Sequence, residues 1–322
     1  MKRALITGIT GQDGSYLADF LLDKGYEVHG IVRRATIEDE RKLANIKHIR
    51  KDINLHICSL ENSLNLIKVI TDVKPDELYH LAASSFVSYS FEEEFSIINF
   101  NFTSTHYILA TLKEFAPNCR IYYAGSSEMF GNVEISPQKE DTPFNPRSVY
   151  GISKLSSYHL MKNYREQYGL FACNGIMYNH ESPRRGFQYV TRKITSSAAR
   201  IKRNLQDSLY LGNIDAVRDW GYAPDYVEAM WLMLQQEQAD DYIISTGRLH
   251  SVKEFLEIAF NYLDLNYEDY VKIDKKFYRS SEKIPLCGDY SKAFNLLEWK
   301  PQKNFKNMII EMIEHDIKII NY

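Results

Sequence analysis

Four polar side chains in two short stretches of the chain have the types and spacing of a proton-transfer site. The stretch YAGSSEMFG contains Ser126 and Glu128 directly after an apolar run, and VYGISKL contains Tyr150 and Lys154. Residues four apart share one face of a helix. A phenol ordinarily loses its proton at about pH 10, and a nearby ammonium lowers that pKa. We therefore expect Tyr150 to accept a proton from a substrate hydroxyl whose oxygen Ser126 also hydrogen-bonds.

Glu128 stands where a buried parallel strand is expected to end, and ligands bind at that edge of an α/β sheet. When a sugar hydroxyl is oxidised to a ketone, the proton on the adjacent carbon becomes acidic. A carboxylate can then remove this proton, and the next hydroxyl leaves as water. Because a simple reductase or epimerase has no use for such a base, Glu128 predicts a dehydratase. Two structural alternatives stay open: a surface acid at a strand end, and an ordinary Tyr–Lys pair on a plain helix.

A glycine-rich loop lies at the start of the chain. TGITGQDG, from Thr7 to Gly14, follows an apolar run and opens a segment with helical spacing. Small residues let the backbone approach a pyrophosphate, and the amino end of a helix favours its charge. The alternative is a tight strand–helix turn without a ligand. We predict a dinucleotide-binding loop with contacts from Gly8, Thr10, Gly11, Gln12, Asp13 and Gly14.

Two arginines end the second apolar run, in the order Val32-Arg33-Arg34. A loop that prefers NAD usually carries an acid at this place, where the acid holds the ribose hydroxyls. Two cations suit a 2′-phosphate instead. We therefore predict NADP as the cofactor, with a solvated arginine pair as the alternative.

Short apolar runs alternate with helical spacing through the first half of the chain, which predicts a parallel sheet with helices on both faces. The expected strands are Ala4–Thr7, Tyr26–Val32, Leu55–Cys58, Glu77–Ala82, Arg120–Ala124 and Tyr242–Ser245. The expected helices are Tyr16–Asp23, Leu64–Val73, Thr103–Phe115 and Tyr226–Gln236. HESPRRG (180–186) and LGNIDAVRDWG (211–221) are expected to be loops around a site. The C-terminal part, 250–322, is expected to contain short helices and one loop, FYRSSEKIPLCGD (277–289).

This pattern predicts the fold class: an α/β protein with a Rossmann-type doubly wound parallel sheet and a smaller, mostly C-terminal substrate-binding domain. Residues 1–175 are expected to bind the cofactor, with some later segments returning to this domain. Residues 176–322 are expected to be mainly a substrate-binding cap.

Composition excludes several classes of function. The chain has 322 residues, 44% of them hydrophobic, and a formal net charge of −3, so no basic field indicates a nucleic acid. No apolar run reaches the roughly 18 residues of a membrane helix. Four widely separated cysteines show no metal-binding or disulfide spacing. We expect no metal, no signal peptide and a cytoplasmic location.

Eight longer stretches carry a more specific signal: TGITGQDGSYLADFLL, VHGIVRR, YGISKL, NYREQYG, NHESPRRG, VTRKIT, GNIDAVRDWG and YVEAMWLMLQQ. They resemble the GDP-mannose 4,6-dehydratase family of the extended short-chain dehydrogenase/reductase superfamily, from residue 3 to beyond residue 300. The resemblance implies NADP, a GDP-sugar substrate and an internal redox cycle. Hydride leaves C4, water is lost across C5 and C6, and the same hydride returns to C6 to give a 4-keto-6-deoxy sugar.

The resemblance also implies roles for individual residues. The catalytic set is Ser126, which stands where the family has Thr, with Glu128, Tyr150 and Lys154. Further cofactor contacts are Ser59, Leu60, Leu81, Ala82, Ala83, Tyr150 and Lys154. Substrate contacts are Ser85, Ser126, Asn179, Arg184, Lys193, Gly212, Arg218, Arg279 and Glu282. Arg184 looks like a ligand of the diphosphate, since arginine holds phosphates by charge-assisted hydrogen bonds.

The chain departs from the family pattern in three places. Ala83-Ser84-Ser85-Phe86-Val87 replaces Ala-Gln-Ser-His-Val, and the small Ser84 leaves room for a bulkier substituent on the sugar. Cys58-Ser59-Leu60 replaces Gly-Asp-Leu, and the loop after Arg34, which helps to build a tetramer in the family, is shorter. GDP-mannose is therefore the default substrate, with GDP-N-acetylglucosamine or a GDP-heptose as alternatives, in a homo-oligomer that is a dimer or a tetramer. A GDP-sugar C4 dehydrogenase, reductase or epimerase, and a nucleotide-binding sensor without turnover, are the competing hypotheses.

Overall fold

The structure is a computed structural model that describes residues 1–84, 91–277 and 284–320. Ser85, Arg279 and Glu282 lie outside these ranges, as does part of the loop expected at 277–289. Their assignment to the substrate site stays a prediction.

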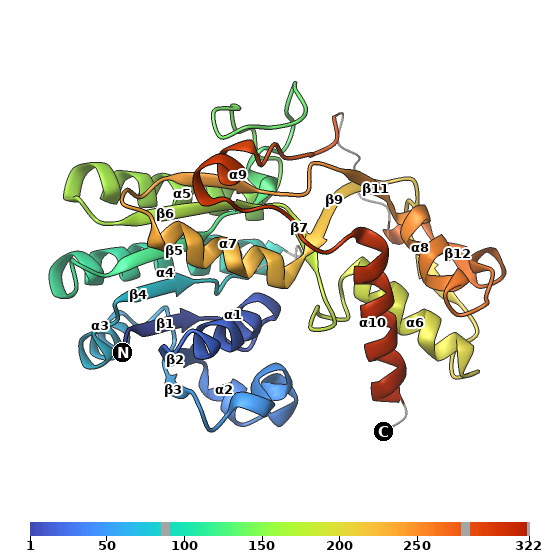
Figure 1. Ribbon diagram of the computed structural model, residues 1–322, viewed down its shortest axis with the longest axis horizontal. Helices are drawn as coiled ribbons and strands as arrows, with labels where there is room; N and C mark the ends of the chain where they lie inside the picture. The colour runs from blue at the N-terminus through green and yellow to red at the C-terminus, as the bar shows by residue number, and fades with distance from the viewer. Residues whose placement is uncertain (85–90, 278–283, 321–322) are drawn as a thin grey trace.

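A seven-stranded sheet forms the larger part of the molecule (Figure 1). All of its strand pairs are parallel. In spatial order the strands are β10 (Asp241–Ile244), β6 (Ala172–Met177), β5 (Arg120–Ala124), β4 (Glu77–His80), β1 (Arg3–Thr7), β2 (Glu27–Val32) and β3 (Asn54–Ile57). The chain moves outward from β1 to β3 on one side and from β4 to β10 on the other, so the order reverses between β1 and β4. This doubly wound sheet confirms the predicted fold class.

Helices cover both faces of this sheet, because parallel strands are apolar on both sides. One face packs against α1 (Gln12–Asp23), α7 (Ala223–Gln235) and α9 (Ser291–Leu297). The other packs against α3 (Ser63–Val73), α4 (Phe91–Phe115) and α5 (Val149–Tyr168). The two faces therefore have separate apolar cores, and α7 and β10 return to the large sheet from late in the chain.

A smaller unit lies beside the carboxyl ends of β6 and β10 (Figure 1). Its elements are a three-stranded sheet of β11 (Leu249–Ser251), β9 (Val217–Tyr222) and β7 (Asn179–Glu181), the pair β12 (Val271–Ile273) and β8 (Leu209–Leu211), and the helices α6 (Val190–Lys202), α8 (Val252–Asn261) and α10 (Phe305–Ile320). The three helices share one apolar core. A buried ion pair between Arg192 and Asp316, at 2.6 Å, joins α6 to α10.

The remaining elements are short. They are α2 (Arg34–Ile37) and the 3₁₀ segments η1 (Glu40–Ile49), η2 (Ser127–Met129), η3 (Tyr267–Asp269) and η4 (Lys275–Phe277). Of these, η2 matters most for the site, because it follows β5 directly.

Two expectations about the elements are corrected by the structure. The helix expected at Thr103 begins at Phe91; its first half exposes Phe95 and Ile98, so it lacks the polar outer face that marks a helix in sequence. The loops expected at 180–186 and 211–221 contain β7 and most of β9, which pair in parallel. Strands that pair with a distant segment have no local periodic signature when they are this short. The other expected elements agree in type and place, with shifts at their ends.

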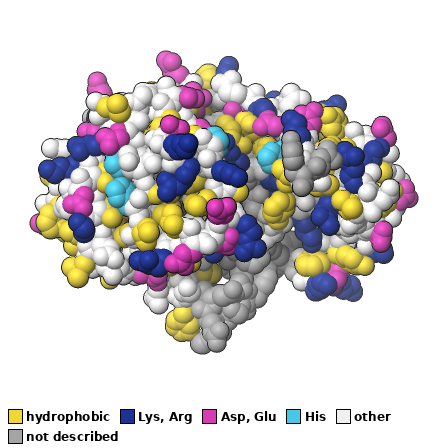
Figure 2. Space-filling model, turned by 90° about the horizontal axis from the view of Figure 1, so that it is seen from below, with side chains coloured by type: hydrophobic (Ala, Val, Ile, Leu, Met, Phe, Trp, Pro, Cys, Tyr) yellow, Lys and Arg dark blue, Asp and Glu magenta, His cyan; other side chains and the backbone are white. Residues whose placement is uncertain are grey.

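The molecular surface carries charges of both signs. On the face shown in Figure 2, Lys and Arg side chains lie interspersed with Asp and Glu over the coloured, described residues. Within the described part of the chain, none of the helices combines the length and the apolar character needed to span a bilayer.

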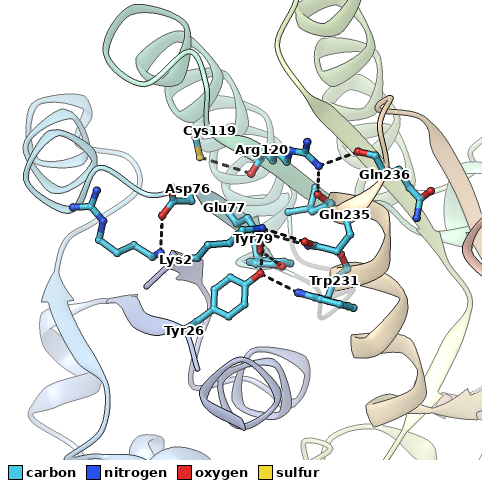
Figure 3. A network of polar contacts seen from close by, with 12 residues as sticks. Lys2, Tyr26, Asp76, Glu77, Tyr79, Cys119, Arg120, Trp231, Gln235 and Gln236 are labelled. Carbon is cyan, nitrogen blue, oxygen red and sulfur yellow. Dashed lines mark hydrogen bonds and ion pairs between the residues drawn. The ribbon is translucent and has the colours of Figure 1, made fainter. Parts of the chain in front are cut away.

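A buried polar network lies at the amino end of β4 (Figure 3). The carboxylate of Glu77, 1% exposed, accepts hydrogen bonds from Lys2 at 3.0 Å, Tyr26 at 3.0 Å, Tyr79 at 2.7 Å and Gln235 at 3.2 Å. The network joins the residues just before β1 and β2 to β4 and α7. It lies at the end of the sheet opposite to the glycine loop, so it positions the sheet rather than a ligand.

Candidate active site

The glycine loop joins β1 to α1 at the carboxyl edge of the sheet. Gly8 has a φ of +77°, and a Cβ there would lie 2.9 Å from the backbone nitrogen of Ala82. A Cβ at Gly14 would collide with the carbonyl oxygen of Gly8. Both positions therefore require glycine. Gly11 is the N-cap of α1 and no side chain caps the helix, which leaves the first N–H groups of the helix available to an anion. This loop fits the pyrophosphate of a dinucleotide.

The end of β4 is held against this loop. The hydroxyl of Thr7 accepts hydrogen bonds from the backbone N–H groups of Leu81 and Ala82, both at 3.1 Å. Further along, the N–H of Ser84 donates to the side chain of Asn101 at 2.9 Å. The structure thus brings the predicted cofactor contacts Leu81 and Ala82 next to Gly8.

The predicted catalytic residues meet at the neighbouring strand end. Ser126 and Glu128 follow β5, and the Glu128 N–H donates to the Ser126 hydroxyl at 3.2 Å. Tyr150 and Lys154 lie in the first turns of α5. The residue after Tyr150, Gly151, packs so closely on η2 that a Cβ would lie 2.6 Å from the Glu128 carbonyl oxygen. The close approach of α5 to η2 explains how residues from two distant stretches come together.

Lys154 is buried, with 3% exposure. Its Nζ donates to the carbonyl oxygen of Ala124 at 2.8 Å and lies 5.7 Å from the centre of the Tyr150 ring. Burial lowers the pKa of Lys154 to about 7, although the Asp13 carboxylate acts in the opposite direction. The amine therefore changes its charge in the neutral range.

The pKa of Tyr150 is raised, first by burial and then by the neighbouring Tyr189 phenol, while the Glu128 carboxylate adds to the rise. A hydrogen bond with Ser126 and the charge of Arg185 lower it. The sequence spacing predicts this lowering effect for Lys154. In the structure the cation among the main influences on the pKa of Tyr150 is Arg185. The pKa of Lys154 is itself lowered to about 7 by burial, and its amine donates to the Ala124 carbonyl oxygen.

Two residues of the site have no role in the sequence analysis. Arg185 forms an ion pair with the buried Glu181 at 3.1 Å, and its guanidinium stacks on the Tyr189 ring at 3.7 Å. Both Arg185 and Tyr189 act electrostatically on Tyr150. The SPRRG run signals an arginine here, but adjacent arginines look alike in sequence. Tyr189 has no signal of its own.

Arg184, by contrast, turns towards α1. Its guanidinium pairs with Asp19 at 2.7 Å, stacks on the Tyr16 ring at 3.9 Å and donates to the Ser15 hydroxyl at 3.2 Å. These contacts do not bring it to the Ser126–Tyr150 group. Its assignment as a diphosphate ligand stays a prediction.

The remaining predicted substrate contacts lie in the smaller unit. Asn179 is on β7 opposite Trp220 of β9, and Arg218 on the same β9 strand donates to the Val217 carbonyl oxygen at 2.6 Å. Lys193 donates to the Tyr210 carbonyl oxygen at 2.7 Å and lies over the Phe277 ring. Gly212 follows β8 in a half-buried bend.

Arg33 and Arg34 are exposed at the end of β2. Cys58, whose N–H donates to Val32 at 2.9 Å, places Ser59 and Leu60 at the adjacent end of β3. The predicted adenosine end of the cofactor site is therefore a single strip along the carboxyl edge of β2 and β3, next to the glycine loop on β1.

Asp13 and Gln12 of the loop direct their side chains to β7. The Asp13 carboxylate is 2.9 Å from Nε2 of His180, and the Gln12 amide donates to the His180 carbonyl oxygen at 3.1 Å. The Ser182 hydroxyl donates to the Gln12 side chain at 2.8 Å. These contacts join the loop to the strand that carries Asn179.

Comparison with known proteins identifies relatives over nearly the whole chain. A family model described as GDP-mannose 4,6 dehydratase matches residues 5–312. GDP-mannose 4,6 dehydratase 2 of Arabidopsis thaliana is 49% identical over 99% of this chain and 87% of that protein.

Solved structures with the same fold are more distant. dTDP-glucose 4,6-dehydratase of Bacillus anthracis, in complex with NAD, has a TM-score of 0.87 at 20% identity, over 100% of this chain and 98% of that one. RMD from Pseudomonas aeruginosa, complexed with NADPH, has a TM-score of 0.83 at 20% identity, over 99% of this chain and 100% of that one. At such identities the likeness shows the fold alone.

Proposed function

The chain belongs to the GDP-mannose 4,6 dehydratase family, and from this premise we propose that it converts GDP-mannose to the GDP-4-keto-6-deoxy sugar with loss of one water. The observation that carries the proposal is the meeting of Ser126, Glu128 and Tyr150 beside the glycine loop. A carboxylate next to a serine–tyrosine pair supplies the base that dehydration needs and that simple C4 oxidation does not.

We assign each residue one task in the reaction. Tyr150 takes the proton of the C4 hydroxyl, and Ser126 hydrogen-bonds the same oxygen. Glu128 removes the C5 proton after C4 has become a ketone, and the proton that it gains balances the hydroxide lost from C6, so that one water leaves. When hydride returns to C6, C5 regains a proton, and the proton that Tyr150 took from the C4 hydroxyl balances it. A bound nicotinamide supplies the reversible hydride acceptor for C4 and donor for C6.

The charges around Tyr150 tune this chemistry. Arg185 lowers the pKa of Tyr150 against the effect of burial, so it stabilises the phenolate that forms when the C4 proton is accepted. Lys154 adds positive charge below the ring when it is protonated. We infer that Arg185, which the sequence did not indicate, supports the reaction through its charge near Tyr150 and its stacking on Tyr189.

We propose NADP as the cofactor. Its support is the exposed pair Arg33 and Arg34 at the end of β2, together with a glycine loop whose helix start is left uncapped. The cofactor would lie along residues of the large sheet, and the GDP-sugar between it and the smaller unit. We propose this division as residues 1–175 and 176–322, with α7, β10 and α9 returning to the first.

We also propose a homo-oligomer in the cytoplasm. Exposed apolar side chains on the adjacent helices α4 and α5, among them Ile98 and Ile152, support self-association. The four cysteines are free and buried, in line with a reducing compartment. Light scattering after gel filtration distinguishes a monomer, which would contradict the proposal, from a dimer or tetramer.

Mass spectrometry tests the activity directly. The purified protein is incubated separately with GDP-mannose and with GDP-N-acetylglucosamine, without added reductant. Loss of one water from GDP-mannose supports the proposal, and loss from the second sugar alone would replace the substrate but keep the reaction. Glu128→Gln provides the control for mechanism, since full turnover by this variant would reject the dehydratase assignment.

A further inference from the structure

The side chain of His180 lies between two groups that only accept hydrogen bonds. Its Nδ1 is 2.7 Å from the carbonyl oxygen of Tyr178, and its Nε2 is 2.9 Å from Oδ2 of Asp13. A carbonyl and a carboxylate have no hydrogen to donate, so each ring nitrogen must carry one. His180 is therefore an imidazolium. Its ring stacks on that of the buried Tyr226, with centres 4.6 Å apart and planes at 28°, which suits a cation over an aromatic face.

The charges near this pair favour the same protonation state. Burial lowers the pKa of His180, but the Asp13 carboxylate outweighs it and the pKa is raised. Burial likewise acts to raise the pKa of Asp13, yet His180 brings it down to about 2. Within the described residues, the other charged or titratable groups that face the pair include Arg185 from the loop after β7, Lys154 from α5, Tyr226 from α7 and the buried Tyr122 from β5.

Asp13 places a negative charge inside the loop that is proposed to bind the cofactor phosphates. It lies in the first turn of α1, where the uncapped N–H groups attract a pyrophosphate. A bare carboxylate in this turn would repel the phosphates that the loop is proposed to bind. The imidazolium removes that repulsion, because it neutralises the carboxylate at hydrogen-bond distance.

The Asp13–His180 pair also holds the glycine loop and β7 at a fixed distance from each other. Asp13 and Gln12 both hold β7, through the side chain and the carbonyl oxygen of His180. The residue next to His180 is Asn179, which is predicted to contact the sugar. A change at His180 therefore moves the substrate strand relative to the cofactor loop as well as changing the charge of the loop.

We propose that His180 is a positioning residue with two tasks. As an imidazolium it neutralises Asp13, so that the glycine loop can bind the cofactor phosphates. It also holds β7 at a fixed distance from that loop. The inference rests on the proposed function, since it assumes that the loop binds a nicotinamide dinucleotide. Cofactor affinity should then depend on the proton of His180. It should be full at neutral pH and fall as the pH rises through the raised pKa.

Binding of NADPH, measured by fluorescence titration between pH 6 and about 9.5, tests this apart from turnover. For the wild type we expect the dissociation constant to rise with pH. For His180→Gln we expect about 10- to 100-fold weaker binding at pH 7, the size of one lost charge-assisted contact, with little remaining dependence on pH. His48→Gln is the matched control, because His48 also pairs with an acid of α1, Asp19 at 2.8 Å, but is half exposed. It should change neither the affinity nor the pH profile.

A second variant keeps the test informative if His180→Gln fails to fold. In Asp13→Asn the histidine loses the partner that raises its pKa, so any remaining pH dependence should move to lower pH. A wild-type affinity that is constant across the pH range would overturn the inference, as would an unchanged profile in either variant. If the wild type dehydrates GDP-mannose while showing such a constant affinity, the proposed function stands and this inference alone fails. If it binds neither NADPH nor NADH at any pH, both fail.

Discussion

Replacing Glu77 by alanine removes the acceptor of four hydrogen bonds at the amino end of β4 (Figure 3). The Tyr79 ring is completely buried, so its hydroxyl loses its partner without gaining water. Leaving one such group unpaired costs about 1–3 kcal/mol. Tyr26 and Gln235 lose their bonds to the same carboxylate, so the neutral partners together account for about 3–5 kcal/mol. Lys2 adds little to this sum, since its side chain is 52% exposed and well solvated. We expect the free energy of unfolding to fall by about 3–5 kcal/mol.

The corresponding shift in melting temperature follows from chain length. Unfolding entropy amounts to about 2.1 cal/mol/K per residue, so for 322 residues each kcal/mol corresponds to about 1.5 °C. Glu77→Ala should therefore lower Tm by about 4–7 °C. Glu77→Gln keeps one of the two acceptor oxygens without its charge and turns the other into an NH2 donor, which the Tyr79 or Tyr26 hydroxyl can accept by rotating. We expect this smaller change to cost about 2 kcal/mol, or about 3 °C.

Differential scanning fluorimetry measures these shifts, with Glu237→Ala as the control. Glu237 is exposed just after α7, and its loss should change stability by no more than about 0.5 kcal/mol. Because Glu77 lies at the end of the sheet opposite to the glycine loop, turnover at 20 °C should be unchanged in both variants. A Tm within about 1.5 °C of wild type for Glu77→Ala would refute the assigned contribution. Reduced turnover of either variant at an unchanged Tm would refute the conclusion that the Glu77 network does not contribute to the active site.

Three further predictions concern the site. Tyr150→Phe removes only a hydroxyl, so turnover of GDP-mannose should fall by about 100-fold or more while NADPH binding is retained; normal turnover would reject the base assignment. Arg33→Ala with Arg34→Ala should weaken NADP at least about tenfold and NAD by less than about twofold in calorimetric titrations; equal weakening would mean that the arginines do not contact the 2′-phosphate. The pKa of Asp13, about 2 when folded against an ordinary 3.8, means that its pair contributes stability above pH 3.8 that is lost as the pH falls towards 2. In a plot of Tm against pH, Asp13→Asn should therefore lose less Tm than the wild type as the pH falls from 3.8 towards 2. An equal loss of Tm in both proteins would contradict this assignment.

Local sequence patterns were enough for the fold class and for the core of the proposed catalytic group. Alternation of apolar runs with helical spacing predicts the doubly wound sheet, because a parallel strand is buried on both faces and each covering helix repeats at 3.6 residues. The loop Gly8–Gly14 is recognisable because its conformation excludes side chains at Gly8 and Gly14. Tyr150 and Lys154 are recognisable because four residues along a helix bring side chains to one face.

Tertiary packing decided what adjacent or distant residues do. Arg184 and Arg185 look equivalent in sequence. In the structure Arg184 pairs with Asp19 on α1, whereas Arg185 pairs with Glu181 and acts on Tyr150. The pairing of Asp13 with His180 joins residues 167 apart, and no local pattern can indicate it. Such contacts depend on which elements lie side by side after folding. A short-range period in the sequence determines how a segment folds, but the charge environment of each side chain is determined by the neighbours that long-range packing brings to it.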